Sequence, residues 1–223
     1  MKDNYRFTDL EDKDKREEWW QKELAECAHC YRIPMYNLPL PLYFRRPPKH
    51  CVDVGANVGT FSYYASGFFQ NIYSYEAMKQ TYEAAKENLQ GVKNVKLHNL
   101  AVSDESDKEV KIVAHSSGLS GDSSVYNTTE DNLYEVVKTI DLNKIFVDNS
   151  IDRIDYLKVD CEGSEYQLLM NKNLSKIDFL AMELHPGYLG KERTKELLEH
   201  LDKYFVLHYN LGEHILFYGN KEI

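Results

Sequence analysis

The feature that most constrains the fold is a glycine-containing turn at residues 53–61, between an apolar run and a segment with helical character. The apolar run 51–54 leads into Gly55, and Gly59 follows where the helix is expected to begin. A second apolar run, about twenty residues later, ends in Glu76. In open α/β sheets an acid at that place accepts hydrogen bonds from ribose hydroxyls. The spacing therefore predicts a parallel sheet with a nucleoside site at its carboxyl edge.

The turn also restricts which nucleoside can bind. Dinucleotide fingerprints carry a glycine two residues after the first one, where the backbone must approach a pyrophosphate, and this chain has Asn57 there. We expect Gly55 to allow a sharp turn and Gly59 to let the new helix pack close to the strand. The pattern Asp-x-Gly-x-Asn-x-Gly resembles the first motif of S-adenosylmethionine-dependent methyltransferases, which implies Asp53 as the partner of the methionyl amine. A nicotinamide cofactor and a purely structural turn stay open as alternatives.

Length and charge exclude several classes of protein. A chain of 223 residues has room for one domain of ordinary size with a short appendage. The formal charge is 27 − 36 = −9, without a long basic run, which argues against a nucleic-acid partner. No stretch approaches the roughly 20 apolar residues of a membrane span, and the first residues lack the apolar segment of a signal peptide. We therefore expect a cytoplasmic protein with reduced cysteines.

The pattern of apolar residues divides the chain into two parts. Residues 9–30 have the spacing of an amphipathic helix, and residues 34–48 contain five prolines, which favour an extended connector. We expect 1–49 to form an N-terminal helical cap and connector, and 50–223 to form the main domain. Strands are predicted at 51–54, 72–76, 95–99, 156–160 and 179–184, with helices at 58–66, 78–90, 163–171 and 191–203.

Two segments depart from this alternation of strands and helices. Residues 204–210 and 213–219 flank Leu211-Gly212 and predict an antiparallel hairpin at the sheet edge. Residues 103–150 contain a run of serines and glycines, and we interpret them as a polar loop that acts as a lid or substrate loop, or as a passive insertion. The predicted fold is an α/β Rossmann-like fold with a seven-stranded, mostly parallel sheet and an N-terminal helical extension.

Several motifs together resemble the FkbM-type methyltransferases. They are Asp-Val-Gly-Ala-Asn-Val-Gly-Thr-Phe-Ser at 53–62, Tyr-Glu-Ala at 75–77, Asn-Leu-Ala-Val-Ser-Asp at 99–104, Thr-Ile-Asp-Leu at 139–142, Ile-Asp-Tyr-Leu-Lys-Val-Asp-Cys-Glu-Gly-Ser-Glu at 154–165 and Met-Glu-Leu-His at 182–185. The resemblance spans roughly residues 50–220 and implies a class I fold that uses S-adenosylmethionine. Many relatives carry Val where this chain has Cys161 and Ala where it has Ser164. The acids of the motif are retained.

The resemblance also implies which residues bind the cofactor. Asp53, Gly55, Asn57 and Gly59 would surround the methionine moiety, Glu76 would hold the ribose, and the strand end near Ala101 would border the adenine. The full set of expected cofactor-binding residues is Asp53, Gly55, Ala56, Asn57, Gly59, Thr60, Glu76, Ala77, Ala101 and Asp160. The expected acceptor is a hydroxyl of a sugar, a glycan or another small metabolite.

A second group of acids follows the strand at 156–160. Asp160 and Glu162 would face one side if the chain stays extended, and both would then lie at the edge where ligands bind. For Glu165 we favour a simpler interpretation, as a negative charge near the start of a helix. Glu183 and His185 alternate at the end of the next strand, so both should project toward the same crevice.

These residues allow two mechanisms and one non-catalytic alternative. In the first mechanism His185 or Glu162 removes the proton of the acceptor hydroxyl while Asp160 orients the reactants. In the second, Asp160, Glu183 and His185 bind a divalent cation, a placement that looks like that of catechol-type O-methyltransferases. The alternative is a nucleoside-binding module without catalysis. The sequence leaves the acceptor and the oligomeric state open.

Overall fold

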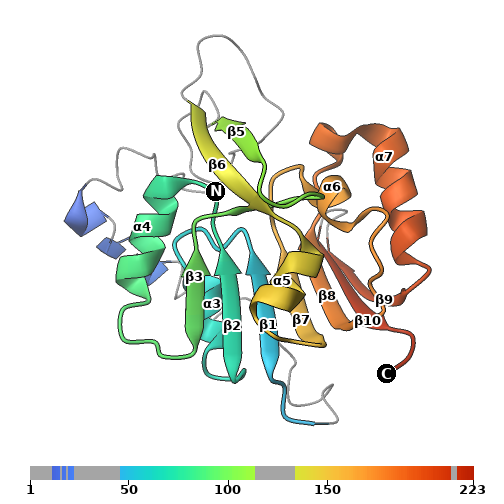
Figure 1. Cartoon of the computed structure of the whole chain (residues 1–223), viewed down its shortest axis with the longest axis horizontal. Coiled ribbons are helices and arrows are strands. Elements are labelled where there is room, and N and C mark those ends of the chain that lie inside the picture. Colours follow the sequence, from blue (N-terminus) through green and yellow to red (C-terminus); the bar gives the residue numbers. More distant parts are fainter. Residues whose placement is uncertain (1–11, 16, 19, 23–45, 114–133, 212–214) are drawn as a thin grey trace.

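A seven-stranded sheet forms the centre of the molecule (Figure 1). The computed structural model describes residues 12–15, 17–18, 20–22, 46–113, 134–211 and 215–223. The strand order is β3-β2-β1-β7-β8-β10-β9. The strands are β1 (His50–Val54), β2 (Asn71–Tyr75), β3 (Val95–His98), β7 (Ile154–Val159), β8 (Ile177–Glu183), β9 (Phe205–Leu211) and β10 (Ile215–Asn220). The first five of these run parallel, and β10 is antiparallel to both of its neighbours. The predicted sheet and C-terminal hairpin are confirmed.

The strands at the centre of the sheet are apolar because both of their faces are buried. Every residue of β7 is buried, and the strand contributes to two core clusters, with Leu157 in one and Tyr156 in the other. Such strands lack the polar alternation of a one-sided sheet, and this explains the continuous apolar runs in the sequence. The helices are α3 (Thr60–Ala65), α4 (Lys79–Asn88), α5 (Leu142–Asp148), α6 (Glu165–Leu169) and α7 (Pro186–Leu201).

Helix α7 begins five residues earlier than predicted. Pro186 occupies the first helical position, where its fixed φ angle suits a helix and its missing N–H is not needed. Gly190 then departs from helical geometry, with φ 77° and ψ 163°, so the element is two helical pieces joined across a kink. The sequence pattern identified only the second piece, which carries the regular apolar spacing.

Part of the expected loop at 103–150 is wrong, because residues 109–113 and 134–140 form strands and residues 142–148 form a helix. Strands β4 (Ala101–Val102), β5 (Glu109–Val113) and β6 (Tyr134–Ile140) form a second sheet in the order β4-β6-β5, which lies above the carboxyl edge of the main sheet (Figure 1). Asp141 caps α5 by accepting the N–H of Lys144 at 2.9 Å. Residues 114–133, which contain the serine-rich run, lie outside the described residues.

Part of the predicted N-terminal helix packs on the main domain. Residues 13–15, 17–18 and 20–22 have helical backbone. Trp20 is buried and packs edge-to-face against Tyr63, with 5.4 Å between the ring centroids. It shares a buried cluster with Val58 and Met78. Residues 34–45 of the connector, together with Cys27 and Cys30, lie outside the described residues, and the domain boundary at 49/50 stays a prediction.

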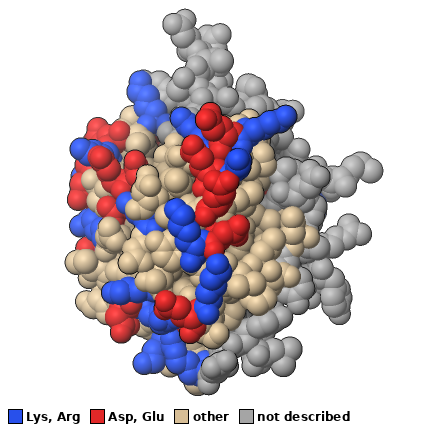
Figure 2. Space-filling model, turned by 90° about the vertical axis from the view of Figure 1, so that its right-hand side faces the viewer, with Lys and Arg blue, Asp and Glu red and all other residues tan. Residues whose placement is uncertain are grey.

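The face formed around α7 carries acidic and basic side chains next to one another (Figure 2). No helix among the described residues is both long enough and apolar enough to cross a bilayer. Cys51 and Cys161 are free thiols, as the sequence predicted for them.

Candidate active site

The turn after β1 adopts a conformation that requires glycine at its first position. Gly55 has φ 74°, and a Cβ atom there would lie 1.7 Å from the carbonyl oxygen of Asp160. The N–H groups of Gly55 and Ala56 both donate to the carbonyl oxygen of Tyr75, each at 3.0 Å. Asn57 also has a positive φ, 50°, which asparagine tolerates better than most residues. The turn therefore joins β1, β2 and the end of β7.

Gly59 serves a different contact from the predicted one. A Cβ atom at this position would meet Leu89 Cδ1 at 3.0 Å and Ala85 Cβ at 3.3 Å. Both residues belong to α4 or its C-cap, so Gly59 allows the start of α3 to approach a helix and not the strand. Its φ of 88° adds a second reason for glycine.

Glu76 lies at the end of β2 and holds the turn together. Its Oε2 accepts the N–H of Asn57 at 2.8 Å, and its Oε1 accepts the N–H of Met78 at 2.9 Å and the hydroxyl of Thr81 at 2.7 Å. Burial raises the pKa of Glu76, and these hydrogen bonds oppose the rise. The residue also lines the cavity at the carboxyl edge. A carboxylate in this position is available to a ligand on one side and fixed on the other.

Asp53 is buried beside Lys158. Its side chain is fully buried, accepts the hydroxyl of Ser62 at 2.5 Å, and lies 3.2 Å from Lys158 Nζ. It is not among the residues that line the cavity. The direct contact of Asp53 with a methionyl amine stays a prediction.

Lys158 is a site residue that the sequence analysis missed. Its ammonium group donates to the carbonyl oxygen of Gly55 at 2.6 Å and lies 3.9 Å from Asp160 Oδ2. Burial would lower the pKa of Lys158, but Asp53 and Asp160 raise it above its usual value. A charged lysine thus connects the glycine turn with two acids. The signal was present, because a lysine within an apolar strand needs a buried partner.

A cavity opens at the carboxyl edge beside the turn. Of the predicted site residues, seven line it: Gly55, Asn57, Glu76, Ala77, Ala101, Asp160 and Glu162. Ala56, Gly59 and Thr60 are buried or packed behind the turn, and His185 is not part of the lining. An apolar wall comes from Leu100 and from Val110 and Ile112 of the second sheet. The cavity therefore combines an apolar wall with the carboxylates of Glu76, Asp160 and Glu162.

Beyond Asp160 the chain turns instead of staying extended. Glu162 has φ 48° and Gly163 has φ 102°. A Cβ atom at Gly163 would lie 2.8 Å from Tyr188 Cβ, so this turn packs directly on the start of α7. The turn brings Glu162 Oε2 to 3.1 Å from His185 Nε2. The side chains that follow β7 and β8 therefore lie close together, as predicted. They meet because the chain turns at Glu162, whereas the sequence analysis assumed an extended chain there.

His185 is surrounded by carboxylates. Its Nδ1 lies 2.6 Å from Glu165 Oε1, and its Nε2 lies 3.8 Å from Glu183 Oε1. Glu165 is the first residue of α6, as predicted, but it is also fully buried, so a helix-end charge does not account for its contact with His185. Burial lowers the pKa of His185, but Glu165, Glu162 and Asp160 outweigh it and raise the pKa to about 9. The surrounding carboxylates therefore favour the imidazolium form of the ring, which has no free lone pair with which to accept a proton.

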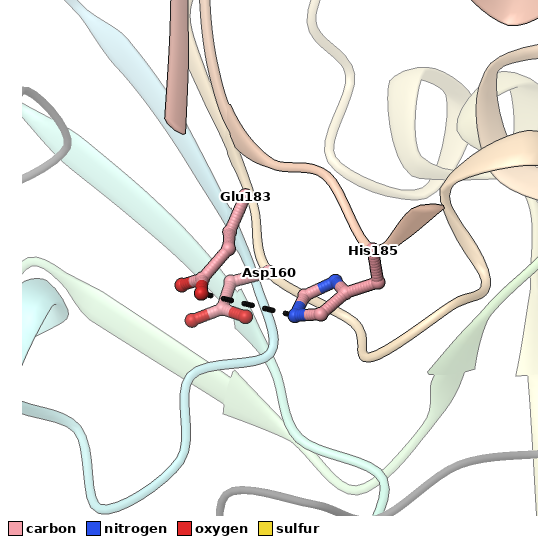
Figure 3. Close-up of side chains that lie close together, drawn as sticks. All are labelled: Asp160, Glu183 and His185. Atoms are coloured by element: carbon pink, nitrogen blue, oxygen red, sulfur yellow. Dashed lines mark ion pairs between the residues drawn. The ribbon is translucent and has the colours of Figure 1, made fainter. Parts of the chain in front are cut away.

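Asp160, Glu183 and His185 also have the arrangement of a potential cation site. One ligand atom from each lies within 4.8 Å of the others. The two carboxylates lie side by side, and the imidazole points toward them from the opposite side (Figure 3). Two carboxylates and an imidazole are a donor set that suits several divalent cations. The same cluster is also satisfied without an ion when His185 carries a proton.

A comparison with protein families decides the classification. The model of the methyltransferase FkbM domain matches residues 53–212, which is more than half of the chain. The chain belongs to the FkbM methyltransferase family. All the candidate site residues of this FkbM chain, from Asp53 to His185, lie inside the matched range.

Individual relatives are distant. Hexuronic acid methyltransferase AglP of Haloferax volcanii is 26% identical over 149 residues, which cover 66% of this chain and 60% of AglP. The crystal structure of methyltransferase FkbM from Methylobacillus flagellatus superposes with a TM-score of 0.53 at 15% identity, covering 84% of this chain and 48% of that one. This FkbM chain thus spans about half to three fifths of the length of these two relatives.

Proposed function

We propose that this chain transfers a methyl group from S-adenosylmethionine to a hydroxyl oxygen of a sugar or glycan. The observation that carries the proposal is the position of Asp160. It lines the cavity together with Glu76 and the glycine turn, and it also belongs to the cluster around His185. One residue therefore borders both the expected cofactor site and the expected acceptor site.

The cofactor would bind along the polar side of the cavity. A carboxylate has about four acceptor positions, and Glu76 uses three for internal donors, so one is left for a ribose hydroxyl. Leu100, Ala101, Val110 and Ile112 offer an apolar surface suited to an adenine ring. Asp53 would act indirectly, because it holds Lys158, and Lys158 holds Gly55 and Asp160.

Methyl transfer needs little from the protein beyond alignment and removal of one proton. The acceptor oxygen forms a bond to the methyl carbon while the carbon–sulfur bond breaks, and S-adenosylhomocysteine leaves with the electron pair. Holding the oxygen, carbon and sulfur in line supplies much of the acceleration. The hydroxyl proton then passes to a carboxylate. Glu162 is the better base, because it lines the cavity, whereas the carboxylates around His185 favour the protonated form of its ring.

A sugar acceptor is supported by the relative that acts on hexuronic acid. Sugar hydroxyls also suit a crevice with several carboxylates, since carboxylates accept hydrogen bonds from neighbouring hydroxyls. The identity of the sugar and the predicted cytoplasmic location stay predictions.

A metal-assisted reaction is the second candidate, favoured by the arrangement of Asp160, Glu183 and His185. A divalent cation bound there would lower the pKa of a coordinated hydroxyl. His185 would have to lose its Nε2 proton, and Glu165 would continue to hold Nδ1. Exhaustive EDTA treatment distinguishes the two candidates, because only the metal-assisted reaction would stop and then recover on addition of Mg²⁺ or Mn²⁺.

The proposal is tested by cofactor binding and by methyl transfer. We expect S-adenosylhomocysteine, and not NAD(H), to raise the melting temperature, and Glu76→Ala to abolish that rise. Glu83→Ala is the control, since Glu83 lies on α4 with a half-exposed side chain near Lys86. Radiolabelled S-adenosylmethionine is then incubated with a panel of glycosides. Binding without any transfer would favour the non-catalytic module, and stabilisation by NAD(H) alone would overturn the assignment of the cofactor.

A further inference from the structure

Glu165 is completely buried, and two nitrogen atoms from different segments approach the same oxygen of its side chain. It is the first residue of α6, and its side chain has no exposed surface. Its Oε1 accepts the N–H of Gly163 at 3.0 Å and faces Nδ1 of His185 at 2.6 Å. A carboxylate buried to this extent costs free energy unless charged or polar partners compensate. The compensation here comes from the ring of His185 and from the turn that carries Glu162.

We propose that Glu165 is a positioning residue that fixes the imidazole of His185 with Nε2 directed at Asp160, Glu162 and Glu183. The proposal deepens the proposed function, because it concerns the side chain that lies between the two strand ends of that site. It holds for either mechanism. In one, His185 orients Glu162 as the base, and in the other His185 presents Nε2 to a cation.

The geometry explains why the ring needs a fixed partner. Rotation about the bond between Cβ and the imidazole is soft, so a histidine ring without a partner can turn over, which places carbon atoms where its two nitrogens were. His185 also precedes Pro186 and has no side-chain hydrogen bond to the helix that it caps. A charged acceptor on Nδ1 fixes the ring about twice as strongly as a neutral one. Nε2 is thereby left for the crevice.

The same carboxylate also joins the two halves of the site. Gly163 belongs to the turn after β7, which supplies Asp160 and Glu162, and His185 belongs to the end of β8, which supplies Glu183. Because one oxygen of Glu165 binds both segments, its removal should let them move relative to each other. A displacement of about 1 Å at reacting groups can lower a rate about 100-fold.

A purely structural role is the alternative explanation. An acid in the first turn of a helix is stabilised by the helix dipole, by at most about 1 kcal/mol at an exposed site. That effect requires neither burial nor a particular neighbour. A structural role would lower stability without a selective effect on the rate.

The test compares Glu165→Gln with Asp155→Asn. Asp155 is a buried acid near the other end of β7, where it accepts the N–H groups of Lys49 at 3.0 Å and His50 at 2.8 Å. We expect Glu165→Gln to lower kcat about 100-fold while the Kd for S-adenosylhomocysteine changes less than about threefold. Asp155→Asn should lower the melting temperature and leave kcat within about threefold. A Glu165→Gln variant with unchanged kcat, or with losses in the same proportions as Asp155→Asn, would overturn the proposal.

A second measurement depends neither on turnover nor on the folding of Glu165→Gln. Nitrogen-15 NMR of the imidazoles at one neutral pH, with the His185 signals assigned from their loss in His185→Gln, reports which nitrogen carries a hydrogen-bonded proton. We expect a proton on Nδ1 with the downfield shift of a hydrogen bond to a carboxylate. An unprotonated Nδ1 would refute the positioning role. If no glycoside is methylated, the proposed function fails while this measurement still decides the role of Glu165.

Discussion

Lys158→Met should destabilise the fold strongly, because it leaves a fully buried carboxylate without its counter-charge. Lys158 and Asp53 have exposed fractions of 2% and 0%, and their charged atoms lie 3.2 Å apart. After the substitution only the hydroxyl of Ser62 would still donate to Asp53 among the contacts described. Removing one partner of a buried ion pair typically costs about 3–5 kcal/mol. Methionine fills a similar volume, so the loss reflects charge more than packing.

The measurement is urea unfolding monitored by circular dichroism at neutral pH. The double variant Asp53→Asn/Lys158→Met removes both charges and should be more stable than Lys158→Met alone, since no unpaired charge remains. Lys86→Met is the control. Lys86 is 62% exposed and pairs with Glu83 at 3.6 Å, so its loss should cost less than about 0.5 kcal/mol.

Two results would refute this reasoning about Asp53. The first is a loss of less than about 1 kcal/mol in Lys158→Met, which would mean that Asp53 has another counter-charge. The second concerns Asp53→Asn alone. If that variant folds normally and loses most of its affinity for S-adenosylhomocysteine, Asp53 contacts the cofactor directly, as the sequence motif suggested.

Three further predictions follow from the site. Gly55→Ala should cost at least about 2 kcal/mol in unfolding free energy and abolish binding of S-adenosylhomocysteine in calorimetry, because its Cβ would lie 1.7 Å from the carbonyl oxygen of Asp160. The pKa of His185, raised from 6.5 to about 9, predicts stability that is fully present below about pH 6.5 and lost as the pH rises through 9. Urea unfolding should show a decline of at most about 3 kcal/mol over that window, and a decline of equal size in His185→Gln would contradict the assignment. Glu162→Gln should lower the single-turnover rate at least about 100-fold if Glu162 is the base, and an undiminished rate would remove it from that role.

The sequence predicted the central sheet because its strands carry a strong local signal. Apolar runs such as 154–159, separated by helical segments, are typical of parallel strands buried on both faces, and the strand bounds agree with the structure to within two residues. The glycine turn and Glu76 were equally legible, because the conformation that they require depends on residue type. Local pattern therefore placed the polar edge of the cavity.

The second sheet was missed because its signal is short and interrupted. Strand β5 alternates Glu109, Val110, Lys111 and Ile112, which is the period of a strand with one buried face. The serine-rich residues between β5 and β6 made the whole of 103–150 look like a loop. As a result the apolar wall of the cavity was not predicted, although Val110 and Ile112 carried its pattern.

The roles of Lys158 and Glu165 depend on contacts between segments far apart in the chain. In the register of β1 and β7, Asp53 lies directly opposite Lys158. Neither strand alone indicates this pairing, yet Asp53 and Lys158 are charged residues within apolar runs, and charges that are buried are usually paired. Glu165 gives no comparable signal, because an acid at a helix start is ordinary until its neighbour is known.

Asp160 links the position of the turn at Gly55 to the position of the carboxylates around His185. Its carbonyl oxygen occupies the space that a Cβ at Gly55 would need, its N–H donates to the carbonyl oxygen of Val54 at 3.1 Å, and its carboxylate approaches Lys158. A ligand that shifts the Gly55 turn must therefore shift Asp160, and with it the carboxylate that faces His185. In an enzyme that must align a methyl donor with an acceptor, this coupling would let the bound donor set the position of the acceptor site. Gly55→Ala should accordingly lower the affinity for the acceptor as well as the affinity for the methyl donor. Glu165→Gln should leave the affinity for the donor unchanged.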